Sequence, residues 1–299
     1  MHTPKRTYFV YEDGCGLLAK VTDVVACFAS LAKCDTVKDA LRDLSAYCSL
    51  VVIASTDNGI SDDMKDYLIS VKEAIAEMTI GVFGVGEDES ELKRLRDEVD
   101  LAIGREADCM GFVSAECVKP DEGVYTDRLL DSSVSFMSKM NVNRKVMERK
   151  DLKQMIDEFI AQHDAICLAC ASDDFVRNTP LDFKYCNGCF YLVSEGGLKF
   201  RALLQNPNVC LTMFDSYKRG GSVTTLQVTG KLTRFPIWSD EYVKALEESW
   251  NSVERHKKSA IRINVLKIIP EKYEFFSYNL KKTDYDLKQV YIPDESDFK

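Results

Sequence analysis

The segment from residue 165 to residue 215 constrains the fold most, because short β-forming runs alternate there with turn signals. The runs occupy residues 165–171, 180–185, 189–193 and 209–214. Asn187 and Gly188 stand between the second and third runs, and Asn-Gly between two apolar runs is the strongest short hairpin signal. The segment therefore predicts antiparallel strands that are joined by tight turns.

The turn after the third run combines two glycines with a lysine. Residues 194–199 read Ser-Glu-Gly-Gly-Leu-Lys, and a short helix is expected at 200–205, before Asn206-Pro207. Glycines let backbone N–H groups approach an anion closely, and a lysine adds positive charge. A solvated surface turn could have the same sequence, and Glu195 opposes an anion there. Local chemistry leaves both interpretations open.

The order of these elements resembles the flavin-binding split barrel of the pyridoxamine 5'-phosphate oxidase-like families. The matching features are Pro180 at a strand start, the run at 190–192, Ser194, Lys199, and the Asn-Pro and apolar run at 206–211. The resemblance covers roughly residues 152–279. It implies an antiparallel β split barrel with flanking helices, which binds FMN and works as a homodimer with the flavin at the subunit interface.

The resemblance also implies where the parts of FMN would bind. The phosphate would meet positive or hydroxyl groups and backbone N–H groups, supplied by Arg177, Ser194, Gly196, Gly197 and Lys199. Gly197 stands where the family often has a serine, and Leu198 where it often has a basic residue. Arg177 is also compatible with a solvated turn residue.

The flavin ring requires a flat apolar wall and polar groups near its carbonyls. The resemblance assigns the wall to Leu192 and Val193, and the polar contacts to Thr225 and Gln227 on a long strand expected at residues 223–235. Thr225 and Gln227 are also compatible with ordinary strand surface. Trp238 and Trp250 are candidates for the ring edge or the dimer interface, or for helix packing in the case of Trp250.

The front of the chain alternates strands and helices. Strands are expected at residues 5–11, 49–54, 79–85 and 109–114, and helices at 17–32, 60–78 and 89–104. Fully apolar strands between helices predict a doubly wound parallel sheet that is covered on both faces. The order resembles flavodoxin. Because 299 residues exceed one ordinary core, we expect a flavodoxin-like domain at 1–118, a linker at 119–150 and the FMN-binding split barrel at 151–299.

The loop after the first strand differs from the flavodoxin pattern. Flavodoxins bind the flavin phosphate there with Ser and Thr hydroxyls, whereas residues 12–16 read Glu-Asp-Gly-Cys-Gly. Two carboxylates repel a dianion, so we expect this domain to have lost its flavin and to serve in partner docking or dimer support. The alternative is a retained site in which the ring lies over Ser55, Thr56, Asn58 and Gly59.

Charge and cysteine content exclude several function classes. A net charge of −9 gives no support for a nucleic-acid or membrane partner, and no apolar run approaches 18 residues. The start has no signal-peptide pattern, so we expect a cytoplasmic protein. Cys167 and Cys170 lie three apart on a strand and face opposite sides. Cys186 and Cys189 supply only two ligands, so no metal site is expected.

The sequence therefore predicts an FMN-dependent oxidoreductase with a small-molecule substrate or electron donor. No Ser-His-Asp, Cys-His or paired-carboxylate arrangement supports hydrolysis, because the three histidines are scattered. Two alternatives remain: a flavin- or haem-binding module without turnover, such as a sensor, carrier or electron relay, and a structural dimer that binds no cofactor.

Overall fold

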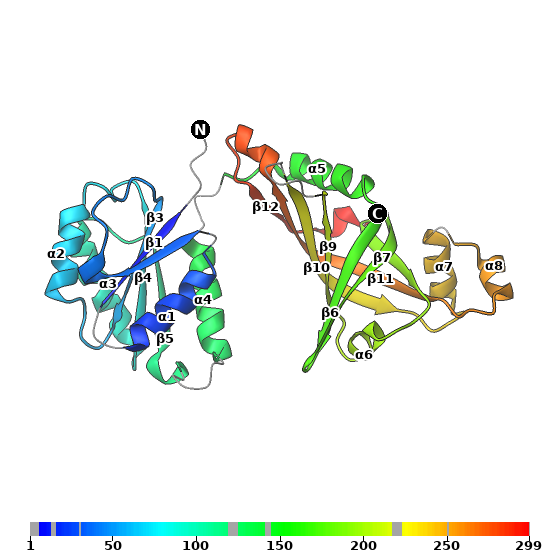
Figure 1. Ribbon diagram of the computed structural model, residues 1–299, viewed down its shortest axis with the longest axis horizontal. Helices are drawn as coiled ribbons and strands as arrows, with labels where there is room; N and C mark the ends of the chain where they lie inside the picture. Colours follow the sequence, from blue (N-terminus) through cyan, green and yellow to red (C-terminus); the bar gives the residue numbers. More distant parts are fainter. Residues whose placement is uncertain are drawn as a thin grey trace. The chain divides into compact units, whose positions relative to one another are not determined.

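Two compact units, His2–Arg144 and Lys145–Lys299, make up the chain (Figure 1). The computed structural model describes residues 6–12, 16–29, 31–118, 125–140, 145–216, 223–249 and 251–298. The predicted fold class is confirmed, with a parallel α/β unit followed by an antiparallel barrel. The predicted domain bounds stay a prediction; helix α4 (Asp127–Met140), inside the expected linker, packs against β5 of the first unit.

The first unit is a five-stranded parallel sheet in the order β2-β1-β3-β4-β5, the order of flavodoxin-like folds. Its strands are β1 (Thr7–Tyr11), β2 (Ala32–Thr36), β3 (Ser49–Ser55), β4 (Thr79–Gly86) and β5 (Cys109–Ser114). Apolar side chains of α1 (Gly16–Cys27) and α4 pack on one face. Those of α2 (Asp62–Val71) and α3 (Leu92–Ile103) pack on the other.

The central strands are buried on both faces because successive side chains enter different cores. Leu50 and Val52 of β3 join the core below α2 and α3, whereas Val51 and Ile53 join the core below α1 and α4. Gly81 of β4 faces α4, and a Cβ there would lie 2.6 Å from the Phe136 ring. The glycine therefore lets α4 approach the sheet.

One strand of this unit was missed from the sequence. The helix expected at residues 17–32 ends at Cys27, and Ala32–Thr36 forms the edge strand β2. This strand contains Lys33, Asp35 and Thr36 and is partly exposed, so it has no apolar run that would reveal it. The expected helix at 60–78 is also shorter. Helix α2 begins after Ser61, which caps it by accepting the Met64 N–H at 3.2 Å, and it ends at Val71.

The second unit is a closed antiparallel barrel. The hydrogen-bonded order is β10-β9-β6-β7-β8-β11-β12, and pairing of β10 with β11 closes a ring of six strands. The strands are β6 (Ala165–Ser172), β7 (Phe175–Cys186), β8 (Cys189–Ser194), β9 (Asn208–Phe214), β10 (Thr224–Arg234), β11 (Asn264–Ser277) and β12 (Lys288–Tyr291). The predicted Asn-Gly hairpin is confirmed, since Asn187 and Gly188 have φ of 50° and 71°.

Strand β11 continues through Pro270, since residues 264–277 form one strand. The register against β10 shifts between Thr229 and Gly230, so that Gly230 pairs with Pro270 and Thr229 with Lys272. Proline donates no backbone hydrogen bond, and the extra residue, Glu271, makes a β-bulge at that point.

Four helices accompany the barrel. They are α5 (Arg149–Ala161), α6 (Lys199–Leu203), α7 (Asp240–Glu248) and α8 (Val253–Lys258). The apolar face of α5 packs on the barrel core. Helices α7 and α8 are separate, because α7 ends at Glu248 and Ser252 caps α8. No helix in the described ranges is long and apolar enough to cross a bilayer.

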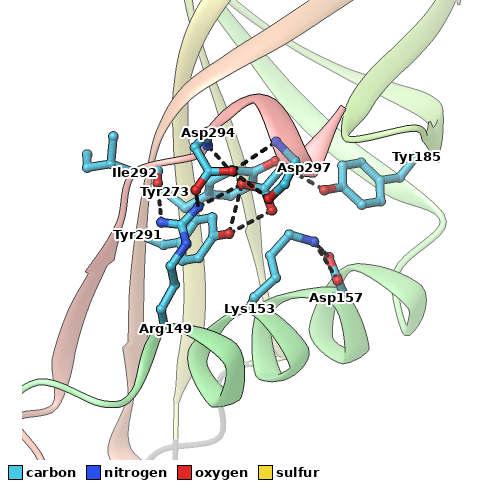
Figure 2. Close-up of polar contacts among 10 residues, drawn as sticks. Arg149, Lys153, Asp157, Tyr185, Tyr273, Tyr291, Ile292, Asp294 and Asp297 are labelled. Carbon is cyan, nitrogen blue, oxygen red and sulfur yellow. Dashed lines mark hydrogen bonds and ion pairs between the residues drawn. The ribbon is translucent and has the colours of Figure 1, made fainter. Parts of the chain in front are cut away.

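Arg149 of α5 forms ion pairs with two aspartates near the C-terminus (Figure 2). The guanidinium lies 2.8 Å from the Asp294 carboxylate, 2.9 Å from that of Asp297, and 4.3 Å from the centre of the Tyr291 ring. The Tyr291 hydroxyl donates to Asp297 at 2.7 Å. A Cβ on Gly188 would overlap the Asp297 carbonyl. Helix α5, strand β12 and the β7–β8 hairpin therefore meet at the C-terminal segment. We call these contacts of Arg149, Gly188, Tyr291, Asp294 and Asp297 the C-terminal clasp.

Candidate functional site

The turn between β8 and α6 has a backbone shape that requires glycine. Gly196 and Gly197 have φ of 146° and 106°, values that L side chains rarely adopt. The Ser194 hydroxyl, buried at the end of β8, accepts the Gly196 N–H at 3.2 Å. The N–H groups of Gly197 and Leu198 donate to no acceptor in the described part of the chain. The turn thus offers backbone donors that the fold does not use.

Lys199 is a buried cation at this turn. Its residue is only 6% exposed, and its Nζ donates to the Gly196 carbonyl at 2.5 Å. Burial lowers the pKa of Lys199, nearby Cys170 opposes that shift, and Arg177 adds to it. A buried ammonium loses several kcal/mol of hydration. A backbone carbonyl is a weak replacement for an anionic partner.

The register of the barrel brings Arg177 to the same place. Arg177 of β7 pairs directly with Cys170 of β6, so their side chains leave the same face of the sheet. The Cys170 thiol is 3.7 Å from both the Arg177 and the Lys199 carbonyl oxygens. Burial raises the pKa of this thiol, and the charges of Lys199 and Arg177 lower it. The two predicted phosphate residues are therefore neighbours around Cys170.

Neither cation is neutralised by the surrounding chain. Among the described residues, no carboxylate forms an ion pair with Lys199 or Arg177. Arg201, on the same short helix, differs: its guanidinium lies 3.7 Å from an Asp174 carboxylate oxygen. Glu195, which the sequence placed against an anion, is exposed. We call Arg177, Ser194, Gly196, Gly197 and Lys199 the cationic turn.

The predicted ring-binding residues are more scattered. Leu192 is fully buried in the barrel core, and Val193 is half-buried on the opposite face of β8. Thr225 is half-buried and Gln227 is exposed, both on β10, which is separated from β8 by β11. Within one barrel these four residues do not form one surface, and their roles stay predictions. Trp250 lies outside the described residues.

Cys170 is the member of this site that the sequence analysis did not assign. Burial alternates along β6, and Cys170 lies on the buried face with Ile166 and Leu168. Its contact with Lys199 arises because α6 packs against β6. The only available signal was the register of the β6–β7 hairpin, which sets Cys170 opposite Arg177.

In the first unit, Glu12 occupies the edge where flavodoxins bind phosphate. Its carboxylate accepts the Ser61 N–H at 2.5 Å, while Asp13 and the rest of the loop to Cys15 lie outside the described residues. Two side chains of α3 form hydrogen bonds with the backbone in and next to the alternative site at 55–59. Arg94 donates to the Thr56 carbonyl at 2.7 Å, and Glu98 accepts the Ile60 N–H at 2.9 Å. The loss of flavin from this unit stays a prediction.

The two cysteine pairs considered for zinc are arranged differently. Cys170 is buried in the core whereas Cys167 is on the other face of β6, and Cys186 and Cys189 are opposite each other across the hairpin turn. Across the ranges that the structure describes, no three His, Cys, Asp or Glu side chains gather in a metal-binding arrangement.

Comparison with known proteins gives structural neighbours only. No family model matches the sequence, and neither does any curated protein. A FAD-binding protein from Mesorhizobium loti is 20% identical, over 40% of this chain and 89% of that one, with a TM-score of 0.34. A haem-binding protein from Mycobacterium smegmatis is 13% identical, over 44% and 54%, with a TM-score of 0.35.

A third neighbour carries the family name that the sequence resemblance suggested. It is a protein from Clostridium acetobutylicum related to general stress protein 26 of B. subtilis, of the pyridoxinephosphate oxidase family. It is 13% identical, over 50% of this chain and 99% of that one, with a TM-score of 0.33. Because these TM-scores are low, we base the fold on the strand pairing alone.

Proposed function

We propose that the barrel unit binds FMN and that the chain is an FMN-dependent oxidoreductase. The observation that carries this proposal is that Lys199, a buried cation, and its neighbour Arg177 have no carboxylate partner among the described residues. The chain as a whole has a net charge of −9, so an anion would be held there by these local positive groups. A phosphate dianion would replace the hydration that Lys199 has lost, which makes the turn a favourable anion site.

The residues present fit a phosphate group. The Lys199 ammonium and the Arg177 guanidinium would supply charge-assisted hydrogen bonds, and so would the N–H groups of Gly197 and Leu198, which have no acceptor among the residues that the structure describes. A Cβ built on Gly196 meets no atom within 4 Å, so the space beside the turn is open. In this role the backbone amides take the place of the serine that the family pattern has at Gly197.

Exposed apolar side chains near the cationic turn support a homodimer with the flavin at its interface. Val176 precedes Arg177 on β7 and therefore leaves the opposite face of that strand; it is 73% exposed, and Leu198, which precedes Lys199, is 65% exposed. Leu204, at the end of α6, is 62% exposed. A flavin ring and the surface of a second subunit are the kinds of partner that would cover such side chains.

The roles of the chain's own residues follow from this placement. FMN, when bound, supplies the electron-transfer chemistry. Lys199 and Arg177 would hold the phosphate end, and Ser194 would keep the turn in its binding shape through the Gly196 N–H. The proposed site assigns no proton transfer to these residues. Substrate and electron donor would approach at the ring end, with Val193, Thr225 and Gln227 of the two subunits as proposed neighbours.

Spectroscopy and titration test this proposal. The full-length protein should give a flavin absorption spectrum after incubation with FMN, and Lys199→Met or Arg177→Met should weaken the affinity by roughly 10–100-fold, the size of one charge-assisted hydrogen bond. Arg201→Met is the matched control, since the Arg201 charge is already paired. An unchanged affinity in both site variants would refute the phosphate assignment.

Turnover separates an enzyme from a binder. NAD(P)H should reduce the bound flavin, and an added acceptor should reoxidise it repeatedly. A flavin that binds but is not turned over would instead indicate a carrier or sensor. A Soret band on the purified protein, with no FMN binding, would indicate haem and would contradict the proposed cofactor.

A further inference from the structure

A cavity that shares no residue with the cationic turn lies beside helices α7 and α8. Its volume is about 380 Å³. Its lining comes from the segment after β10, from α7 and α8, and from the loop that leads into β11, and includes Trp238, Tyr242, His256, Lys257, Ile261 and Arg262. Helix α7 packs on Tyr191 and Val265 of the barrel, so one wall of the cavity is anchored to the sheet.

Trp238 at this cavity has an unusual backbone conformation. Its φ is +64°. Glycine, asparagine and aspartate tolerate this left-handed value, but it is uncommon for a bulky residue. The indole is 45% exposed and meets the Tyr242 ring edge-on at 5.4 Å between centroids. Strained residues of this kind gather at ligand sites, where the surrounding structure holds a side chain in place. Here a partly exposed aromatic side chain lines the cavity.

The charges around the cavity are all positive. Lys257 and Arg262 form no ion pair with any residue that the structure describes, and the lining contains neither aspartate nor glutamate. His256 is oriented by its contact with the Asn251 side-chain oxygen at 3.2 Å. The Tyr242 hydroxyl donates to the Ile263 carbonyl at 3.0 Å and so fixes the loop that carries Arg262. The cavity therefore combines an exposed aromatic side chain with two cations that have no ion pair among the described residues.

We propose that this cavity is a binding site for a nucleoside monophosphate. The base would pack on Trp238 and the exposed Ile261, and the phosphate would meet Lys257 and Arg262. Its volume is near the lower end of the range of about 300–1,000 Å³ that is typical of small-molecule pockets. That size suits one ring system with one charged group. The site stands independently of the flavin proposal, because neither its residues nor its test depend on the cationic turn.

Calorimetric titration of the full-length protein with AMP, adenosine and FMN tests the proposal. AMP should bind more tightly than adenosine, because only AMP carries the phosphate. Lys257→Glu and Arg262→Glu should each weaken AMP by about tenfold or more, the effect of losing a charge-assisted contact. Lys258→Glu is the matched control, since Lys258 is the next residue of α8 and does not line the cavity. Trp238→Asn, whose new side chain tolerates positive φ, should weaken AMP and adenosine alike.

The two sites can fail separately. Lys199→Met should weaken FMN and leave AMP unchanged. Absence of AMP binding at millimolar concentration, or equal AMP affinity in Arg262→Glu and Lys258→Glu, overturns the cavity proposal whatever FMN does. If AMP binding is lost in Lys199→Met and kept in Arg262→Glu, AMP occupies the cationic turn, and the cavity proposal fails while the anion site at that turn stands. Thermal unfolding of each variant shows that a lost affinity does not reflect a lost fold.

Discussion

Replacement of Lys199 by methionine should separate ligand binding from stability. In the free protein the substitution removes one hydrogen bond from a charged donor, a net contribution of about 1.5–3 kcal/mol. It also removes a buried ammonium, whose effective desolvation penalty is several kcal/mol. The Gly196 carbonyl keeps the Ser194 hydroxyl as a donor at 3.3 Å, so it is not left without a partner. We therefore expect the free variant to be as stable as the wild type, or more stable by about 1–3 kcal/mol.

Urea unfolding of the full-length protein with and without FMN measures both effects. Without FMN, the barrel transition of Lys199→Met should move to equal or higher urea. With FMN at 100 times its wild-type Kd, the wild type should gain about 2.7 kcal/mol, and the variant much less. Arg201→Met should gain as much from FMN as the wild type. If Lys199→Met loses more than about 2 kcal/mol without ligand and still gains the full increment from FMN, Lys199 is structural and the reasoning is wrong.

Three further predictions concern pH and the C-terminal clasp. Burial lowers the folded-state pKa of Lys199 below its ordinary 10.5, so the unfolded chain binds more protons than the folded chain between those two pKa values. The free energy of unfolding of the wild type, relative to that of Lys199→Met, should therefore rise as pH rises through the folded-state pKa. The affinity for FMN should fall over the same pH range, because Lys199 loses its charge. A difference that is flat with pH up to 10.5 would contradict this. Arg149→Ala should lower the free energy of unfolding in urea by about 1–3 kcal/mol, because it removes two partly exposed ion pairs, a hydrogen bond to a carbonyl and the contact with the Tyr291 ring. Lys150→Ala, at the neighbouring exposed residue, is the control. Gly188→Ala should lower stability by at least about 1–2 kcal/mol, because φ is +71° and the new methyl group meets the Asp297 carbonyl; a smaller loss would show that the clasp can shift away.

Local signals in the sequence predicted much of the fold. The apolar runs of β3 and β4 and the Asn-Gly turn each identify their elements within a few residues, because burial on both faces and positive φ leave clear patterns. Strand β2 left no such pattern, since an edge strand with polar residues resembles a loop. The bulge opposite Gly230 also escaped prediction, because it depends on pairing with a distant strand.

The candidate site shows the same difference between local sequence signals and features that depend on distant parts of the chain. The sequence identified Ser194 and Lys199 because they lie on one short turn. The position of Arg177 beside Lys199 depends on strand register, and the role of Cys170 depends on how α6 packs against β6; neither is a local property. The cavity at Trp238 could not be predicted either, because its lining comes from segments around residues 237–242 and 256–263 that only the packing of α7 and α8 brings together.

The affinity difference between FMN and riboflavin tests the central claim most directly, because the two ligands differ only in the phosphate. The wild type should prefer FMN by about 100-fold or more, as two charge-assisted contacts imply. In Lys199→Met this preference should shrink by roughly tenfold or more, with riboflavin binding nearly unchanged. An equal preference for FMN in the wild type and in the variant would show that the phosphate lies elsewhere.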